Sequence, residues 1–525
     1  MFLSLLLLSI LSPAILALGL DLLTATAEEL SYRLSANQIS SVRLVEAYLA
    51  RIEAHNHHGL NLRAVIDVAP RRLLLDQAAL LDHERRIGRL RSRLHGVPIL
   101  VKDSIATHPS LGMQTTAGSF ALEGTIVPDD AGVVARLRKA GVIIIGKSNM
   151  SEWANFRASF GKIPSGWSAR GGQTRSAYVT DPLSPDWNPS GSSSGSAVGV
   201  SAGFSPLALG TETDGSIIMP ASYAALYAIK PAVGIVPIDG VVPVGPSMDS
   251  VGVMGKSAWD MAITLGVMAG EEGKYLDAIY EGVEGLRIGI LREAGFWDGK
   301  GLDRQVCLPP IINESLDALQ KLETLGAVVV DPVYMPSAPE ILLGPGEMAV
   351  LGSFLSSPTT EFKESLPSYL SPLGNTTIRT LSDIITFNVN HAPLEMPPNH
   401  CCQEIFLIAN HTTGTKSPEY LAALTYLRKL SRDEGIQSTM RGFNVDVLVI
   451  PADASRSTTI SAVSGWPIAT VPVGVLASSG RPFGLAFFTS GAGGGGEERL
   501  MRLMGDWWRV AGERSVPGRL RKNLL

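Results

Sequence analysis

Short apolar runs alternate with amphipathic segments along this chain, and that alternation is the strongest constraint on its fold. Residues 97–101 and 142–145 are apolar throughout, whereas residues 133–139 between them are amphipathic. Further strand-like runs occupy residues 286–291, 445–450 and 483–488. Fully apolar runs separated by helical segments are typical of strands that are buried on both faces. The pattern predicts an α/β fold in which helices enclose a sheet.

The overall composition allows a large core and narrows the classes of ligand. Of 525 residues, 45% are hydrophobic and 18% are charged, a balance that favours a globular protein over a disordered one. The net charge of −5 gives no electrostatic reason to expect nucleic acid or an anionic membrane surface as partner. The histidines form no His-x-x-x-His pair and no Cys-x-x-Cys occurs, so no metal site is predicted. A small molecule is the expected ligand, and composition predicts no oligomeric state.

The N-terminal segment has the character of an export signal. Residues 2–18 are almost wholly apolar, no charge precedes Asp21, and Ala17–Gly19 resembles a small-x-small cleavage site. Residues 1–19 are therefore predicted to be a signal peptide of a secreted protein. No Lys or Arg precedes the apolar run, which is about at the lower limit of length for spanning a bilayer, so a protein held by an uncleaved membrane anchor and a cytoplasmic protein are the alternatives. Three of the chain's N-glycosylation sequons would suit a secreted glycoprotein: Asn313, Asn375 and Asn410.

Three familiar motifs occur in the sequence but lack the structural context that each needs. Residues 141–148 match the phosphate-binding P-loop pattern, yet four consecutive apolar residues of high β-propensity predict a buried strand there. Residues 491–496 match a dinucleotide fingerprint, but too little chain follows to complete a βαβ unit. Residues 191–195 match the Gly-x-Ser-x-Gly elbow of α/β-hydrolases, whose turn must follow a strand. The preceding residues 181–189 contain three prolines, so Ser193 is not predicted to be a nucleophile.

The most informative segment is the Gly/Ser-rich stretch of residues 189–216. It is not a linker, because apolar residues such as Val198, Val200 and Phe204 are interleaved and a strand-like run follows at residues 207–210. The stretch ends in a Thr-Asp-Gly-Ser turn at residues 213–216, directly before two isoleucines. Several backbone N–H groups are expected to converge there beside the Ser216 hydroxyl. An oxyanion hole needs such a cluster of donors.

With these residues in view, the sequence resembles the amidase-signature family. The hallmark of that family is a Gly/Ser-rich run around paired serines, followed by a Gly-Thr-Asp/Glu-x-x-Gly-Ser turn, which stands here at residues 210–216. Four further segments match: residues 95–103, 146–154, 166–174 and 465–474. The resemblance extends from about Leu22 to the C-terminus. It implies the amidase-signature fold, a central mixed β-sheet covered by helices on both faces, with residues 20–525 forming one domain.

The resemblance also assigns roles to individual residues. Ser216 lies 24 positions after Ser192, which is the family's separation of its two catalytic serines. It implies that Ser216 is the nucleophile, that Ser192 is a bridging serine on a cis peptide, and that Lys102 is the base. The N–H groups of Thr213, Asp214, Gly215 and Ser216 would then form the oxyanion hole. Asp214 replaces a common Gly of the family, so this turn must accommodate a side chain.

The residue types suit an acyl-enzyme mechanism that needs neither a metal nor an organic cofactor. Lys102 follows an apolar run, and an ammonium group that is enclosed in an apolar site loses its proton more readily. The neutral amine would take a proton from Ser192, which in turn takes one from Ser216. The activated Ser216 attacks the amide carbonyl, and water later hydrolyses the acyl-enzyme.

Two assignments near these motifs stay open. Asp103 either orients Lys102 or caps the turn that follows. Cys402 stands where relatives commonly carry Gly before a Gln-Glu pair; we expect Cys401 and Cys402 to be a buried pair of small apolar residues, with a substrate-pocket role for Cys402 as the alternative. The chain has only three cysteines, so no disulfide framework is predicted.

The sequence therefore predicts an amidase that hydrolyses a carbon–nitrogen bond in a small-molecule amide. Variable loops within residues 336–402 are expected to shape its substrate pocket. One alternative is the glutamine-hydrolysing subunit of a tRNA amidotransferase, against which the apolar leader and the lack of a basic surface argue. The other is a non-catalytic binding protein of the same fold, against which the retention of all three triad residues argues.

Overall fold

A computed structural model describes residues 19–158, 161–292, 296–297, 309–338, 340–341, 347–454 and 457–522 of this chain. The predicted signal peptide, residues 1–19, lies outside these described residues except for Gly19. None of the helices found in the described ranges has both the length and the apolar character needed to cross a bilayer.

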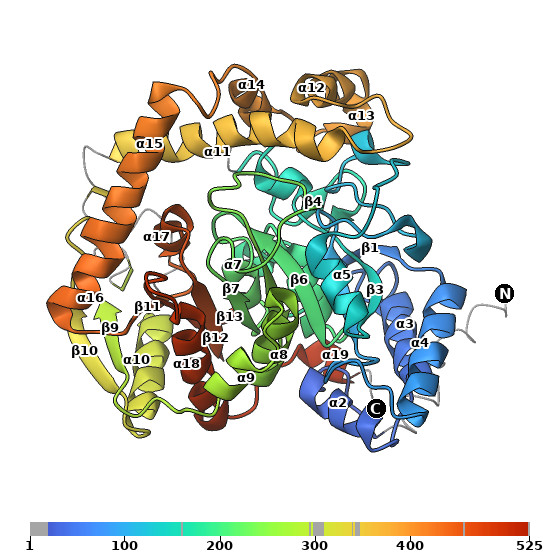
Figure 1. Ribbon diagram of the computed structural model, residues 1–525, viewed down its shortest axis with the longest axis horizontal. Helices are drawn as coiled ribbons and strands as arrows, with labels where there is room; N and C mark the ends of the chain where they lie inside the picture. The colour runs from blue at the N-terminus through green and yellow to red at the C-terminus, as the bar shows by residue number, and fades with distance from the viewer. Residues whose placement is uncertain are drawn as a thin grey trace.

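A single long sheet runs through the described part of the chain and organises the fold (Figure 1). Its eleven strands lie in the order β1-β3-β2-β6-β8-β7-β12-β13-β11-β9-β10. The strands are β1 Val65–Val68, β2 Pro98–Lys102, β3 Ile143–Ser148, β6 Leu207–Glu212, β7 Tyr227–Lys230, β8 Ser250–Gly255, β9 Arg287–Leu291, β10 Val328–Val333, β11 Val447–Pro451, β12 Ile468–Val475 and β13 Pro482–Phe488. A separate two-stranded ribbon pairs β4 Trp167–Ser168 with β5 Gly172–Gln173.

The sheet is mixed, as predicted. Strand β2 pairs in parallel with both β3 and β6, and β9 pairs in parallel with β10 and β11. The strands between these two parallel groups are antiparallel. Every residue of β2, β3 and β13 is buried, which explains why these segments are continuous apolar runs in the sequence. Residues 143–148 of the P-loop-like segment form strand β3, so the predicted buried strand is confirmed.

Helices cover both faces of the sheet, which confirms the predicted α/β class. Helices α6 and α7 pack on the sheet and on each other, whereas α5, α8, α10 and α18 form a second contacting group. The helices of the sheet layers are α2 Ala27–Ser35, α3 Ser41–His55, α4 Arg71–Arg86, α5 Gly132–Lys139, α6 Ser194–Ser201, α7 Ile218–Ser222, α8 Ala258–Ala269, α9 Lys274–Ala278, α10 Pro309–Glu323, α17 Ser457–Ser464, α18 Gly496–Val510 and α19 Gly518–Lys522.

A helical cover lies across one end of the sheet, at the top of Figure 1, and continues down the left side of that view. It consists of α11 Glu347–Leu370, α12 Leu381–Asn390, α13 Ala392–Glu395, α14 Glu404–Asn410, α15 Pro418–Arg428, the π-helix η6 Lys429–Gln437 and α16 Ser438–Phe443. Helix α11 packs against both α14 and α15. Residues 336–402, in which variable loops around the substrate pocket were expected, contribute α11, α12 and α13 to this cover.

The two adjacent cysteines do not form the buried apolar pair that the sequence suggested. Cys401 is exposed, Cys402 is half-buried, and a disulfide joins them. The physical reason is the backbone at Cys402, whose φ of 87° lies in the left-handed region that normally requires glycine. The left-handed residue turns the chain at the start of α14, which keeps the pair at the surface instead of in the core.

Candidate active site

Lys102 ends strand β2 and points into the interior. Its side chain is fully buried, and its Nζ donates to the Ser192 Oγ over 2.8 Å and to the Thr211 carbonyl over 3.1 Å. Burial lowers the pKa of Lys102 to about 7, while the carboxylates of Glu212 and Asp249 act in the opposite direction. A substantial fraction of this amine is therefore neutral at neutral pH, as a general base must be.

Burial alone does not single out Lys102. Lys147 and Lys230 are also fully buried, and burial lowers the pKa of each to about 8. Lys147 donates to the Thr115 hydroxyl and the Ile105 carbonyl, and Lys230 donates to backbone carbonyls. Of these three lysines, only Lys102 contacts a serine hydroxyl. The hydrogen bond, and not the burial, marks it as the candidate base.

Ser192 is held on both sides by backbone contacts. The peptide bond between Gly191 and Ser192 is cis, as the resemblance implies. The Ser192 carbonyl accepts a hydrogen bond from the Ser151 amide over 3.0 Å, and α6 begins two residues later. No side chain fits at residue 191, because a Cβ there would lie 2.5 Å from the Ser151 Oγ. The hydroxyl of Ser192 is thereby fixed against Lys102, shielded from solvent.

Ser216 is the one member of the predicted triad that reaches solvent. It is 8% exposed, whereas Lys102 and Ser192 are both 0% exposed. Ser216 lies in the turn between β6 and α7, and its carbonyl accepts a hydrogen bond from the Ser193 amide over 3.1 Å. This bond ties the turn to the residue next to Ser192. The structure therefore places the two serines on adjacent backbone segments, and Lys102 contacts Ser192, the fully buried one of the two.

The turn at residues 213–216 presents backbone donors without internal partners. None of the amides of these four residues donates a hydrogen bond to another residue in the described ranges. The positive φ of the turn falls on Gly215, at 74°, and not on Asp214, so the side chain at residue 214 is accommodated without a left-handed backbone. Unpaired amides next to a partly exposed hydroxyl fit an oxyanion hole.

Two buried carboxylates, Glu212 and Asp249, lie beside this turn, and a half-buried one, Asp214, lies within it; the sequence indicated a role only for Asp214. The Glu212 Oε2 accepts from the amides of Ile217 and Ile218 over 2.6 and 3.0 Å. Asp249 accepts the Thr213 hydroxyl over 2.5 Å. Burial raises the pKa of Glu212, Asp214 and Asp249, with the hydrogen bonds opposing that rise. Glu212 lies within the family motif, but no sequence signal marked Asp249.

The side chain of Asp103, whose role the sequence left open, forms its hydrogen bonds with residues other than Lys102. Its Oδ2 accepts from the Thr116 hydroxyl over 2.5 Å and from the amides of Thr116 and Gly118 over 3.3 and 3.0 Å. The structure records no hydrogen bond between Asp103 and Lys102 among its described residues. These contacts favour the capping role over the orienting role.

Ser193, in the elbow-like motif, points elsewhere. Its hydroxyl donates to the Thr211 carbonyl over 3.2 Å, and the residues before it form no strand. The absence of a strand confirms the reason for rejecting the elbow.

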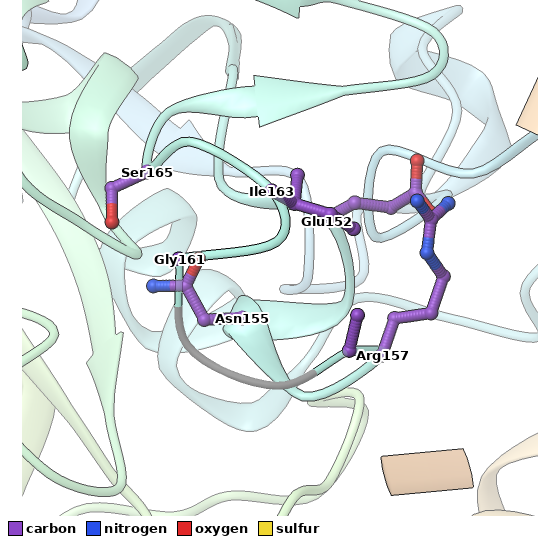
Figure 2. A pocket seen from close by; sticks show the side chains of 7 residues that line it. Glu152, Asn155, Arg157, Gly161, Ile163 and Ser165 are labelled. Carbon is purple, nitrogen blue, oxygen red and sulfur yellow. The ribbon is translucent and has the colours of Figure 1, made fainter. Parts of the chain in front are cut away.

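A small cavity of about 40 Å³ is lined by residues between Glu152 and Ser165. Its lining includes Ser165, whose Cβ is 3.3 Å from where a Cβ on residue 191 would stand. Figure 2 shows the side chains of Glu152 and Arg157 meeting at its edge. Both are fully buried and form an ion pair. Arg157 also donates to the carbonyl of His400 over 2.7 Å, which connects the cavity to the helical cover.

No group of three His, Cys, Asp or Glu side chains in the described ranges is arranged to hold a metal ion.

Comparison with known proteins identifies the class. The sequence profile of the amidase family matches residues 43–486. A protein of Arabidopsis thaliana named as a probable amidase is 37% identical over 482 residues, which cover 88% of this chain and 86% of the relative. The structure of native peptide amidase from Stenotrophomonas maltophilia is 36% identical with a TM-score of 0.81, covering 94% of this chain and 98% of that one.

Another relative, whose match covers less of this chain, is named for a different activity. A glutamyl-tRNA(Gln) amidotransferase subunit from Chloroflexus aurantiacus is 36% identical over 323 residues, which cover 59% of this chain and 60% of that relative.

The chain belongs to the amidase family. It is accordingly a hydrolase that acts on carbon–nitrogen amide bonds, with a small amide as its substrate.

Proposed function

We propose that Ser216 is the nucleophile of this amidase and that Ser192 and Lys102 relay its proton. One observation carries the proposal: the Lys102 Nζ lies 2.8 Å from the Ser192 Oγ in a fully buried pair, and the pKa of that lysine is about 7. A neutral amine in hydrogen-bond contact with a serine hydroxyl can act as a general base towards it.

The proposed proton path runs outward from the lysine. Lys102 takes the proton of the Ser192 hydroxyl as Ser192 takes that of Ser216, and the Ser216 oxygen attacks the substrate carbonyl. When the carbon–nitrogen bond breaks, the departing nitrogen receives a proton through the same relay. A water molecule then attacks the Ser216 acyl group and restores the hydroxyl.

The oxyanion formed in each step would be stabilised by the amides of residues 213–216. These donors have no partner among the described residues, so no internal hydrogen bond must break when the charge develops. Removal of one such donor in serine hydrolases costs roughly 100- to 1,000-fold in kcat. The turn is therefore expected to supply a large share of the rate enhancement.

The relay is tested by a matched pair of substitutions at neighbouring buried serines. Ser192→Ala removes the group between Lys102 and Ser216, whereas Ser193→Ala removes a hydroxyl that donates to the Thr211 carbonyl. Amide hydrolysis should fall by at least about 100-fold in Ser192→Ala, since general acid–base groups contribute about 100- to 10,000-fold. Ser193→Ala should stay close to wild type. Equal losses in both variants would contradict the relay.

Among small amides, we propose that this chain acts on peptide amides. Support comes from the Stenotrophomonas maltophilia peptide amidase, which aligns over nearly the whole of both chains. A panel of aliphatic, aryl, fatty-acyl and peptide amides compares the classes directly. A kcat/KM for peptide amides at least as high as for the others supports the proposal, and a marked preference for fatty-acyl or simple aliphatic amides contradicts it.

Glutamine hydrolysis within a tRNA amidotransferase remains the second candidate, because of the match to the Chloroflexus aurantiacus protein. That match covers only 59% of the chain, which favours the first candidate. Hydrolysis of simple amides by the isolated chain supports the amidase function. Glutamine hydrolysis that occurs only with added partner subunits supports the alternative.

We also propose that the chain is exported and glycosylated. Its apolar leader supports export, and two of the three sequons, Asn313 and Asn375, are exposed. Mass spectrometry of the mature protein from culture medium tests both points. An intact segment of residues 1–19 on a protein confined to the cells contradicts export.

A further inference from the structure

Asp214, whose backbone belongs to the oxyanion turn, directs its side chain to a distant part of the chain. Its Oδ1 accepts a hydrogen bond from the Thr458 hydroxyl over 2.6 Å, and its Oδ2 accepts one from the Thr459 hydroxyl over 2.7 Å. Both threonines lie in the first turn of α17. One carboxylate thus joins the nucleophile turn to a helix 244 residues later in the chain.

The residues next to Asp214 are fixed by other elements. Thr213 is tied to Asp249, whose second oxygen accepts from the amides of Val244 and Gly245 over 2.8 and 3.0 Å. Glu212 holds the amides at the start of α7. Within the described residues, Asp214 alone bonds this turn to α17, and it lies midway along the row of proposed oxyanion donors.

Helix α17 is itself a rigid support. The Arg428 guanidinium donates to the Val463 carbonyl over 2.7 Å, and that of Arg432 donates to the Ser464 carbonyl over 2.6 Å. On the turn side, a Cβ on Gly215 would lie 2.9 Å from the Thr458 Oγ1. The turn and the helix are thus in close contact, and the helix is anchored at its far end by arginines of α15 and η6.

A negative charge at residue 214 is energetically unfavourable in a way that a neutral side chain would avoid. A carboxylate beside a developing oxyanion is unfavourable, and burial raises the pKa of Asp214. Two hydroxyl donors oppose that rise, as does the charge of Lys230. Asp214 itself is half-buried, and Glu212, Asp249 and Lys102 are buried titratable groups around the turn. A carboxylate at this position is best explained by its geometry, because it accepts hydrogen bonds from two hydroxyl groups at once.

We propose that Asp214 is a positioning residue that aligns the oxyanion donors by bonding their turn to Thr458 and Thr459. The proposal rests on the proposed role of Ser216 and its turn. Because the oxyanion exists only after attack, misalignment slows acylation and leaves ground-state binding almost unchanged.

The test uses an alkyl fluorophosphonate, which forms a tetrahedral adduct and needs no knowledge of the natural substrate. The serine oxygen bonds to phosphorus, fluoride leaves, and the serine proton passes to the relay. The saturating inactivation rate and the half-saturating concentration are measured for Asp214→Ala, Asp214→Asn and the double variant Thr458→Val/Thr459→Val. Thr439→Val is the matched control, since it removes another buried threonine hydroxyl, which lies in α16 and donates to the Gly435 carbonyl of η6.

Asp214→Ala and the double variant should each lower the saturating rate by about 10- to 100-fold, since small misplacements in active sites cost up to about 100-fold. The half-saturating concentration should change by less than about threefold, because ground-state binding is preserved. Asp214→Asn should recover most of the rate, because an amide can accept from one threonine and donate to the other. Thr439→Val should keep the wild-type rate despite a lowered Tm.

The proposal is overturned if Asp214→Ala reacts as fast as Thr439→Val, or if Asp214→Asn reacts no faster than Asp214→Ala. It is also overturned if the loss of rate follows the loss of Tm across all the variants. If Asp214→Ala does not fold, the threonine double variant decides the question. Failure of the proposed function is seen separately, because labelling would then persist in Ser216→Ala.

Discussion

Acylation by this enzyme should depend on pH through Lys102, whose pKa burial lowers to about 7. Only the neutral amine can take a proton, so the rate should rise with pH as the ammonium is lost. One unit below the pKa, about a tenth of the lysine is neutral, and each further unit costs about tenfold. The rate should therefore fall about tenfold per unit below pH 7 and level off above about pH 8.

The assay is the second-order rate constant of fluorophosphonate labelling between about pH 5.5 and 9.5, a span that covers the pKa values of the buried lysines. Lys147→Met is the control, because burial lowers the pKa of Lys147 to about 8 while its amine lies outside the relay. That variant should keep the wild-type profile. A flat profile, or a midpoint near the ordinary lysine value of about 10.4, would refute the assignment of Lys102 as the base.

Three further predictions concern the surroundings of the relay. Lys102→Met should abolish activity. It should also raise the free energy of unfolding at pH 7, because the wild-type protein loses about 4 kcal/mol of stability by burying a lysine whose pKa is lowered this far. The hydrogen bonds that the variant lacks offset about 1–3 kcal/mol of that gain. The lowered pKa also makes wild-type stability rise with pH between about 7 and 10.5, and urea unfolding across that range should show a smaller rise in the Met variant. Asp249→Asn removes a charge that raises the pKa of Lys102, so its rate profile should move to lower pH; a shift to higher pH would contradict the electrostatic argument. Arg157→Met should lower stability by about 3–5 kcal/mol, because it leaves the buried Glu152 carboxyl without its ion-pair partner; urea unfolding checks this, and a loss below about 1 kcal/mol would show that the pair contributes little.

Much of the fold could be predicted from local sequence patterns. Apolar runs such as residues 142–145 fit strands buried on both faces, so they identified β3 and excluded a phosphate-binding loop. The same reasoning predicted that the apolar run leading to Lys102 is a strand, which is β2. The order of the strands and the helical cover depend on contacts between distant segments, which no local pattern contains.

The candidate site was predictable where its residues are close in sequence. The family resemblance assigned Ser192 and Ser216 through their separation and the turn at residues 213–216. The roles of Asp249 and of Thr458 and Thr459 were not, because each comes from an element remote in sequence and makes its contact only in the folded chain. Cys402 was misjudged because its left-handed backbone is a property of the loop and not of the residue type.

The central claim is that Ser216 carries the acyl group. Peptide mapping by mass spectrometry after labelling with an alkyl fluorophosphonate tests it most directly, with Ser216→Ala and Ser193→Ala as the compared variants. The adduct should lie on Ser216 in the wild type and in Ser193→Ala, and should be absent from Ser216→Ala. An adduct on Ser193, or equal labelling of Ser216→Ala and the wild type, would contradict the account.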